Sequence, residues 1–205
     1  MAAIKALSQP TEEGRERRKA IREAMEALES ERHALGIEMN IKYTTADCAV
    51  YLADELLPPP TFDKDPERFY HESTYPGFRL PHAWLGTDVM GQLISTQDLA
   101  GKGRFTLFTG IGGKEAWGEA CRRVAEEIKG VEVKCFSVGW GQEYGDVLDM
   151  WEGKRGVQED GCVLVRPDRY VAWRCGSLEE MSVGEGWAGE KLVKVLKHVL
   201  KIETV

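Results

Sequence analysis

The strongest pattern of hydrophobic and polar positions spans residues 105–139, FTLFTGIGGKEAWGEACRRVAEEIKGVEVKCFSVG. Its first run is apolar and rich in Phe and Thr, which favour strands, and a cluster of glycines ends it. Its last run alternates apolar and polar positions as a half-buried strand does. Between them lies one apolar helical stripe, which ends before Gly130 and consists of Trp117, Cys121, Val124, Ala125 and Ile128. A crossover of this length joins parallel strands and is almost always right-handed, so the pattern predicts a βαβ unit.

The patterns that follow this unit predict a β-hairpin and a final helix. In DGCVLVRPDRYVAWRC, two apolar runs flank a Pro-Asp-Arg turn, as in a hairpin. The C-terminal segment carries a second helical stripe, formed by Trp187, Leu192, Val195, Leu196 and Val199. The order βαβ, short helix, hairpin, helix is that of a thioredoxin-like fold. The expected fold class is therefore α/β, with a mixed sheet flanked by helices on both faces.

The N-terminal pattern predicts a helix over residues 11–35 that begins at Thr11 and ends at Gly36. Its apolar positions form a narrow stripe at near-heptad spacing, Ile21, Met25, Leu28 and Leu35, and its other faces carry mixed charge. A stripe this narrow usually docks on the body of the same chain or on a copy of it, and the second alternative would make the protein a homodimer. The predicted domains are a helical extension over residues 1–36 and a thioredoxin-like domain over 37–205.

Two segments join the extension to the central unit. Residues 36–55 are predicted as an extended or hairpin segment, because apolar residues alternate at Ile37, Met39, Ile41 and Tyr43. Residues 57–86 form a long loop, because five of its positions between 58 and 76 are proline. The loop is rich in Tyr, His, Phe and Trp, which is typical of a binding loop or a docking arm.

Composition and charge narrow the function classes. The chain has 205 residues, 42% of them hydrophobic, which is enough for one α/β domain with an appended element. The net charge of −7 and the lack of a basic stripe argue against nucleic-acid binding. The apolar runs are too short to cross a membrane, and the N-terminus lacks the apolar core of a secretory signal.

The cysteines point to a reducing compartment. Five cysteines are present, an odd number without a C-x-x-C pair, at positions 48, 121, 135, 162 and 175. At least three lie in predicted strands or helix faces, where a free Cys usually behaves as a small buried hydrophobe. A redox thiol or a nucleophile stays the alternative. A cytoplasmic location fits this pattern.

Three motifs carry a resemblance to a known family. GCVLVRPDRYVAWR, RLPHAWLG and STQDLAGKGRFTLFTG resemble the C-terminal third of flavin-dependent aromatic hydroxylases of the phenol hydroxylase type. The resemblance covers roughly residues 15–200. It implies a thioredoxin-like domain that, in the family, follows the flavin and substrate domains and contributes to dimerisation. The family often places Gly where this chain has Arg169. A non-glycine residue must therefore adopt the turn conformation, and the conformational cost is small if its φ stays negative.

The chain also departs from the family's flavin chemistry. The family binds its flavin through an N-terminal dinucleotide fold, in which a strand leads directly into G-x-G-x-x-G and a helix. No predicted strand of this chain leads directly into that glycine spacing, so we expect no flavin and no other cofactor. The GIGG cluster at 110–113 is a tight turn, or alternatively an anion site at a helix N-terminus. No metal-ligand spacing is present, so no metal is expected. Disulfide exchange needs a thiolate in the turn after the first central strand, and that turn holds Ile111, Gly112 and Gly113.

The long loop supplies the candidate site. We predict His82 and Arg79 as catalytic residues, because a histidine near neutral pKa moves protons and a guanidinium holds a phenolate or carboxylate. Aromatic side chains that would bind a flat phenolic ligand accompany them, and the predicted substrate-binding set is Tyr70, His71, Tyr75 and Trp84. In the alternative, Arg79 and His82 only tie the loop to the sheet, and His71 lies at the surface.

A second charged cluster is expected to be structural. It contains Asp98, Arg166, Asp168 and Arg174 around the predicted hairpin. The two arginines flank the hairpin and are expected near Asp98 or Asp168. Paired charges of this kind usually hold a loop in place.

Two functions from different classes follow. The first is a flavin-independent protein that binds an aromatic or polyketide-type intermediate and catalyses a cofactor-free proton-transfer step, such as cyclisation, isomerisation, dehydration or cleavage. The second is a non-catalytic dimerisation or accessory module of a flavin monooxygenase. The cysteine pattern excludes a thioredoxin-type redox protein.

Overall fold

The computed structural model describes residues 2–32, 34–43, 45, 49–56, 58–179 and 186–202. The chain forms two compact units. The first comprises residues 1–40 and 62–71, and the second comprises residues 41–61 and 72–205. Cys48 and His33 lie outside the described residues.

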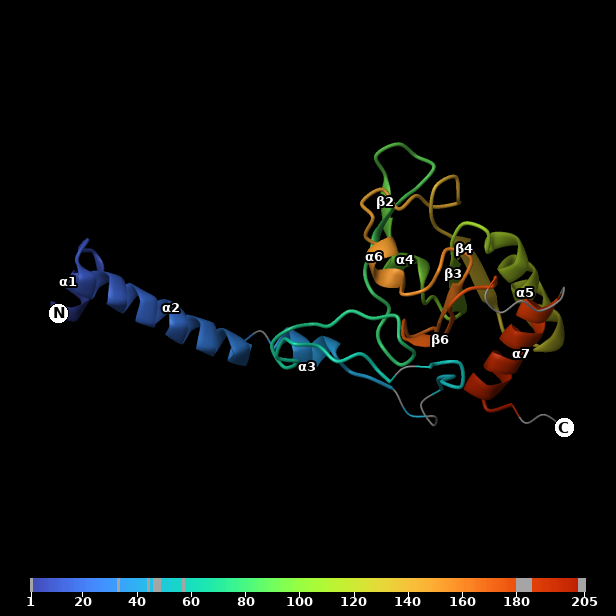
Figure 1. The fold of residues 1–205 in the computed structure, drawn as a ribbon, viewed down its shortest axis with the longest axis horizontal. Coiled ribbons are helices and arrows are strands. Elements are labelled where there is room, and N and C mark those ends of the chain that lie inside the picture. Colours follow the sequence, from blue (N-terminus) through green and yellow to red (C-terminus); the bar gives the residue numbers. More distant parts are fainter. Residues whose placement is uncertain are drawn as a thin grey trace. The chain divides into compact units, whose positions relative to one another are not determined.

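The second unit contains a four-stranded sheet in the order β4-β3-β5-β6. The strands are β4 (Val133–Ser137), β3 (Phe105–Thr109), β5 (Cys162–Val165) and β6 (Val171–Cys175). β3 pairs parallel with β4, and β5 runs antiparallel to both β3 and β6. Helix α5 (Lys114–Glu127) connects β3 to β4, and α7 (Trp187–Val199) follows the hairpin (Figure 1). The predicted βαβ unit, hairpin and thioredoxin-like strand order are therefore confirmed.

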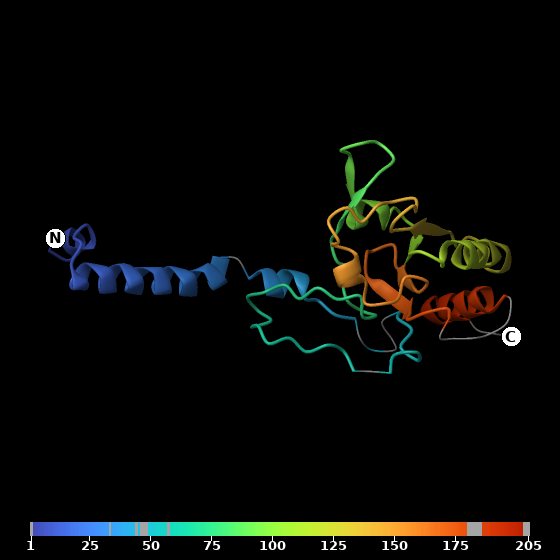
Figure 2. The same ribbon diagram turned by 45° about the horizontal axis from the view of Figure 1, so that its top comes forward.

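One face of this sheet is covered by α5 and α7, which lie side by side in Figures 1 and 2. Leu107, Leu164 and Trp173 point to this side and pack with Trp117 and the apolar stripe of α7. Ala125 is exposed instead of buried, because the buried positions of α5 fall at a slightly different angle, on Trp117, Ala120, Cys121 and Val124.

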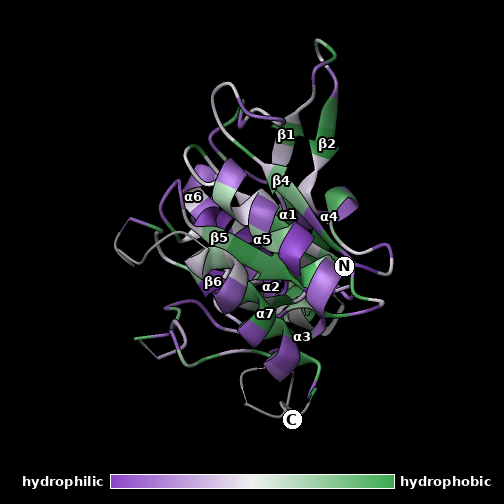
Figure 3. Cartoon of the chain, turned by 90° about the vertical axis from the view of Figure 1, so that its right-hand side faces the viewer, coloured by the Kyte–Doolittle hydropathy of each residue, from purple (hydrophilic) through white to green (hydrophobic). Residues whose placement is uncertain are grey.

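The opposite face is covered mostly by loops and short elements. Phe108, Val163 and Val165 alternate with the residues of the first face and pack against Leu85 and Trp151. The covering segments are the hairpin of β1 (Trp84–Gly86) and β2 (Leu93–Ser95) and the single-turn helices α4 (Thr96–Leu99) and α6 (Glu152–Arg155). Because both faces are covered, most strand positions are apolar, and β5, which is entirely buried, appears in the hydrophobic colour in Figure 3.

The first unit contains the predicted long helix, α2 (Glu12–Arg32), preceded by α1 (Ala2–Leu7). The predicted end at Gly36 is wrong, because α2 ends at Arg32 and Gly36 lies in a separate short helix. The Thr11 hydroxyl accepts a hydrogen bond from the Gly14 amide at 3.2 Å, so the helix begins where the sequence indicated. Gly14 has no room for a side chain, since a Cβ there would lie 2.6 Å from the Ala6 carbonyl oxygen. That close approach lets α1 fold back onto α2.

The prediction of an extended segment from residue 36 is wrong for its first residues, which form the short helix α3 (Leu35–Met39). Tertiary contacts decide this. A Cβ on Gly36 would lie 2.0 Å from the Pro66 carbonyl oxygen, so only glycine permits the packing. Asn40 then donates its amide hydrogens to the carbonyls of Pro66 and Phe69 at 2.8 and 2.7 Å, and its side-chain oxygen accepts from the His71 amide.

Candidate functional site

The six residues predicted as a site fall in two different compact units. Tyr70 and His71 belong to the first unit, and Tyr75, Arg79, His82 and Trp84 to the second. The structure brings His82 and Trp84 into direct contact, with ring centroids 4.8 Å apart in an edge-to-face arrangement. His71, Tyr75 and Arg79 contact residues outside this set, namely Phe62, Arg174 and Tyr170 in turn.

His71 is not a surface residue, because only 8% of it is exposed. Its ring stacks on Phe62 with centroids 4.3 Å apart, and its Nε2 lies 3.0 Å from the Lys64 carbonyl oxygen. Together with the bond from its amide to Asn40, these contacts fix the 62–71 segment within the first unit. The surface alternative for His71 is therefore wrong.

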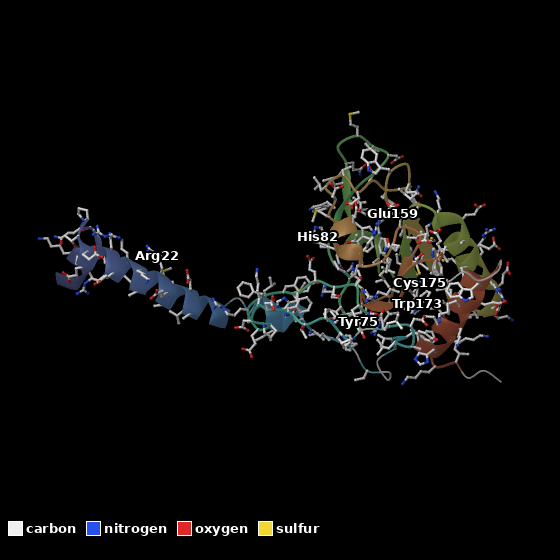
Figure 4. All side chains as sticks on the ribbon, viewed as in Figure 1. Arg22, Tyr75, His82, Glu159, Trp173 and Cys175 are labelled. Carbon is white, nitrogen blue, oxygen red and sulfur yellow. The ribbon has the colours of Figure 1, made fainter. Side chains whose placement is uncertain are left out.

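His82 connects the long loop to the start of α4. Its Nδ1 lies 2.8 Å from the Ser95 hydroxyl, and the same hydroxyl accepts the Gln97 amide as the N-cap of α4. Lys154 in α6 donates to the His82 carbonyl at 2.7 Å and pairs with Glu72 at 2.8 Å, so His82 lies beside α6 in Figure 4. The ring of Trp84 is 40% exposed next to it.

Tyr75 and Arg79 take part in the framework of the second unit. Arg79 pairs through its backbone with Tyr170 in an isolated bridge. Tyr75 is almost completely buried, and the Arg174 guanidinium lies 5.3 Å from its ring centroid. Burial, and then the nearby Glu55 carboxylate, raise the pKa of Tyr75, and Arg174 partly opposes this. The phenol is therefore neutral, and too enclosed to stack on a ligand.

Ion pairs around the hairpin hold neighbouring segments in place. Arg166 pairs with Asp168 across the turn, as expected. Arg174 pairs with Glu55 instead of Asp98 or Asp168, through two hydrogen bonds of 2.7 Å each. The neighbouring Asp54 accepts hydrogen bonds from Trp173 at 2.7 Å and from Lys191 at 2.6 Å. Residues 54 and 55 are thus bound to both β6 and α7.

A cavity of about 410 Å³ lies at the carboxyl ends of β3 and β4. Its apolar and small lining residues are Ile111, Val138, Gly139, Trp140, Gly141, Gly145, Val147 and Trp151, and its polar ones are Gln142, Asp146, Asp149, Glu152, Arg155 and Glu159. None of the six predicted site residues lines it. The signal that could have found it is the segment GWGQEYGDVLDMWEG, which combines two Trp, a Tyr and several acids between glycines.

The turn between β3 and α5, where thioredoxin chemistry would need a thiolate, holds glycines for a packing reason. A Cβ on Gly113 would lie 2.0 Å from the Thr109 hydroxyl and 2.7 Å from the Asp160 carbonyl oxygen. The cysteines of the described residues are free, and three of them, Cys121, Cys162 and Cys175, are buried as the sequence predicted. Burial raises the pKa of Cys162 and, to about 11, that of Cys175, so these thiols stay protonated.

Within the described residues, no group of three or more His, Cys, Asp or Glu side chains is arranged to hold a metal ion. The same part of the chain contains no helix with the length and hydrophobicity needed to cross a membrane.

Comparison with known proteins decides the family. The profile of the family described as aromatic-ring hydroxylase, C-terminal, matches residues 73–201, more than half of the chain. The chain belongs to this family. The matched segment contains most of the second unit, including β1 to β6, α4 to α7 and the cavity.

Relatives extend the likeness into the first unit. Phenol 2-monooxygenase from Pseudomonas sp. (strain EST1001) is 41% identical over 166 residues, which cover 81% of this chain and 26% of that protein. The 2,4-dichlorophenol 6-monooxygenase from Delftia acidovorans is 35% identical over 199 residues, which cover 97% of this chain and 32% of that protein.

A solved structure is similar to this chain. The crystal structure of the flavin-dependent monooxygenase PieE in complex with FAD and substrate matches with 38% identity and a TM-score of 0.75. The match covers 97% of this chain and 31% of that one. The chain therefore spans roughly a quarter to a third of the length of these aromatic-ring hydroxylases.

Proposed function

We propose that this chain acts as the C-terminal accessory module of an aromatic-ring hydroxylase and contributes no catalytic residue of its own. The observation that carries the proposal is the match of 97% of the chain to 31% of a flavin monooxygenase that holds FAD and substrate. In this proposal, flavin and substrate bind to the part of such an enzyme that this chain does not match. The chain itself supplies a rigid domain and a surface for association.

The geometry of the candidate residues supports the accessory role. His82 bonds to the capping Ser95, Tyr75 is enclosed beside Arg174, and His71 is stacked on Phe62. These are contacts that position loops and helix ends. A catalytic group has to reach a ligand, and none of these three side chains lines the cavity.

A chimaera tests the proposal. In the Delftia 2,4-dichlorophenol 6-monooxygenase, the matched 32% would be replaced by this chain. We expect the chimaera to retain FAD and to hydroxylate the parent enzyme's substrate with NADPH. The purified chain alone should retain no FAD and convert no phenol. A chimaera carrying Gly113→Val is the control, because the Cβ has no room there and the module should fail to fold. A correctly folded chimaera without bound FAD would contradict the proposal.

The second candidate function is a cofactor-free proton transfer on an aromatic or polyketide-type intermediate. It is favoured by the partly exposed Trp84, whose ring centroid lies 4.8 Å from that of His82, because an aromatic ligand on this indole would lie near a histidine that could act as a general base. Turnover of a phenolic polyketide by the purified chain, without flavin or NADPH, would establish it. That turnover should fall at least about 100-fold in His82→Ala, and a similar loss in Arg79→Ala would assign Arg79 to the site.

A further inference from the structure

We propose that the cavity at the carboxyl ends of β3 and β4 binds a small organic cation with an aromatic or alkyl body. The cavity opens where the chain leaves two parallel strands, with Ile111 after β3 and Val138 after β4. In open α/β sheets, ligands commonly bind at the carboxyl ends of the strands. Its volume of about 410 Å³ suits a small organic molecule.

Two tryptophans line the apolar part of the cavity, one buried at its inner wall and one exposed to solvent at its edge. Trp151 is buried and packs against Phe108 with ring centroids 5.3 Å apart, so the inner wall belongs to the core. Trp140, by contrast, is 91% exposed although it lines the cavity. A solvent-exposed indole at the edge of a cavity can pack against an apolar ligand, and the face of its ring attracts a cation.

The turn that carries Trp140 is held by hydrogen bonds. The Gly139 amide donates to the Tyr144 carbonyl at 2.9 Å, and the Tyr144 amide donates to the Ser137 carbonyl at 3.0 Å. Gly139 and Gly141 have φ values of +141° and +70°, which the turn requires. The exposed indole therefore starts from a fixed backbone, which lowers the entropy lost when a ligand binds.

The charges around the cavity select the sign of the ligand. Its lining contains four carboxylates, of Asp146, Asp149, Glu152 and Glu159, and one cation, Arg155. The Asp146 oxygens accept the amides of Trp151 and Glu152 at 3.1 and 2.8 Å, which leaves the other three carboxylates at the exposed rim. Glu159 is labelled in Figure 4. A phenolate or carboxylate ligand would be repelled, and an ammonium group attracted.

The proposal is separate from the accessory role, and a matched set of probes tests it in the purified chain. Phenethylammonium, 2-phenylethanol and 3-phenylpropionate share an aromatic body and differ in charge. In isothermal titration calorimetry we expect the cation to bind saturably, about tenfold or more tighter than the alcohol, and the anion not to bind. Added salt should weaken binding of the cation.

Variants locate the binding in the cavity. Trp140→Ala should weaken phenethylammonium binding about tenfold, and Asp149→Asn and Glu159→Gln should each weaken it severalfold and reduce its salt dependence. These positions are exposed, and Asn tolerates the positive φ of Asp149, so the fold should persist. Met90→Ala and Glu126→Gln, exposed positions that do not line the cavity, should change nothing. Failure of all three probes to bind, equal binding of the anion, or unchanged affinity in Trp140→Ala would each overturn the proposal.

Discussion

At the scale of single residues, Arg169 combines a backbone cost with a side-chain gain. Its φ is +68°, so the negative φ that would have kept the cost of a non-glycine residue small is not adopted. The left-handed conformation costs a non-glycine residue roughly 1 kcal/mol. The Arg169 Nε donates to the Gln97 carbonyl at 3.0 Å, which ties the hairpin turn to α4. The hydrogen bond offsets the strain and gives a physical reason for an arginine at a glycine-like position.

Two substitutions separate these contributions. Arg169→Ala removes the hydrogen bond and keeps the strain, so we expect it to lower the free energy of unfolding by about 1 kcal/mol. Arg169→Gly removes the same bond but relieves the strain, so it should be more stable than Arg169→Ala by about 1 kcal/mol. Urea unfolding followed by circular dichroism measures both. An alanine variant at least as stable as the glycine variant would show that the turn is unstrained.

Cys175 makes the stability of the fold depend on alkaline pH. Burial raises its pKa to about 11 from an ordinary value of 9.0. Because the folded chain holds the proton more tightly, this contribution to stability is complete below pH 9 and is lost as the pH rises through 11. The loss should reach about 2 to 3 kcal/mol. Trp173 and Cys175 lie on the α7 side of β6 (Figure 4), where the thiol is enclosed.

The measurement is urea unfolding at intervals from pH 8 to pH 11 in the original chain and in Cys175→Ala. The free energy of unfolding of the alanine variant should fall less over this interval, because the variant lacks the one thiol proton that the folded chain holds more tightly. Its lower stability at pH 8, caused by the smaller side chain, does not affect the slope. If the free energy of unfolding changed equally with pH in the two proteins, other groups, such as Tyr75 with its raised pKa, would account for the whole pH dependence.

At the scale of elements, α2 presents an apolar stripe to solvent. Ile21, Met25 and Leu28 are exposed on one side of the helix, at the spacing i, i+4, i+7. Most of the remaining surface of α2 is charged, with pairs such as Arg17 with Glu13 and Lys19 with Glu23. Exposed ion pairs of this kind contribute little to stability, so the stripe is the feature of α2 that is suited to association. We therefore propose that the chain forms a homodimer and that α2 mediates it.

Changing the stripe tests that proposal. We expect the double variant Met25→Glu, Leu28→Glu to shift the protein from dimer to monomer in sedimentation equilibrium, because carboxylates would be buried without partners at the interface. Lys19→Glu places a carboxylate on the opposite side of the helix and should leave the dimer intact. An original chain that is monomeric at high concentration would remove α2 as a dimerisation element.

At the scale of the whole molecule, the chain consists of two compact units that differ in how much apolar surface they bury. The second unit has two apolar clusters, one on each face of its sheet, so it has the core of an independent domain. The first unit is small and contains a long helix whose apolar residues are largely exposed. In relatives three to four times as long, the corresponding residues belong to a larger protein. An accessory module would be expected to combine a self-sufficient domain with such an incomplete one.

Much of the second unit could be predicted from sequence, and the candidate site could not. The βαβ unit and hairpin follow from local periodicity, and the family follows from three motifs that lie within or near the matched segment. The prediction of His82 and Arg79 as catalytic residues rests only on the chemistry of which their side chains are capable. Whether such side chains reach a ligand depends on contacts with Ser95 and Tyr170, which are distant in sequence. The assignment of the six residues to a site therefore stays a prediction.

The sequence by itself determined the four strands of the mixed sheet, the long helices and the family, because hydrophobic periodicity and motif spacing are local properties of the chain. The strand at residues 84–86, within the segment predicted as a loop, was not among them. Only the tertiary structure decided the helical turn at residues 35–39, the positive φ of Arg169 and the cavity beside Trp140. Each of these depends on groups far apart in the chain meeting in space. Gly36 packs against residues 66 and 67, Arg169 bonds to Gln97, and the cavity is formed by the turns that follow β3 and β4.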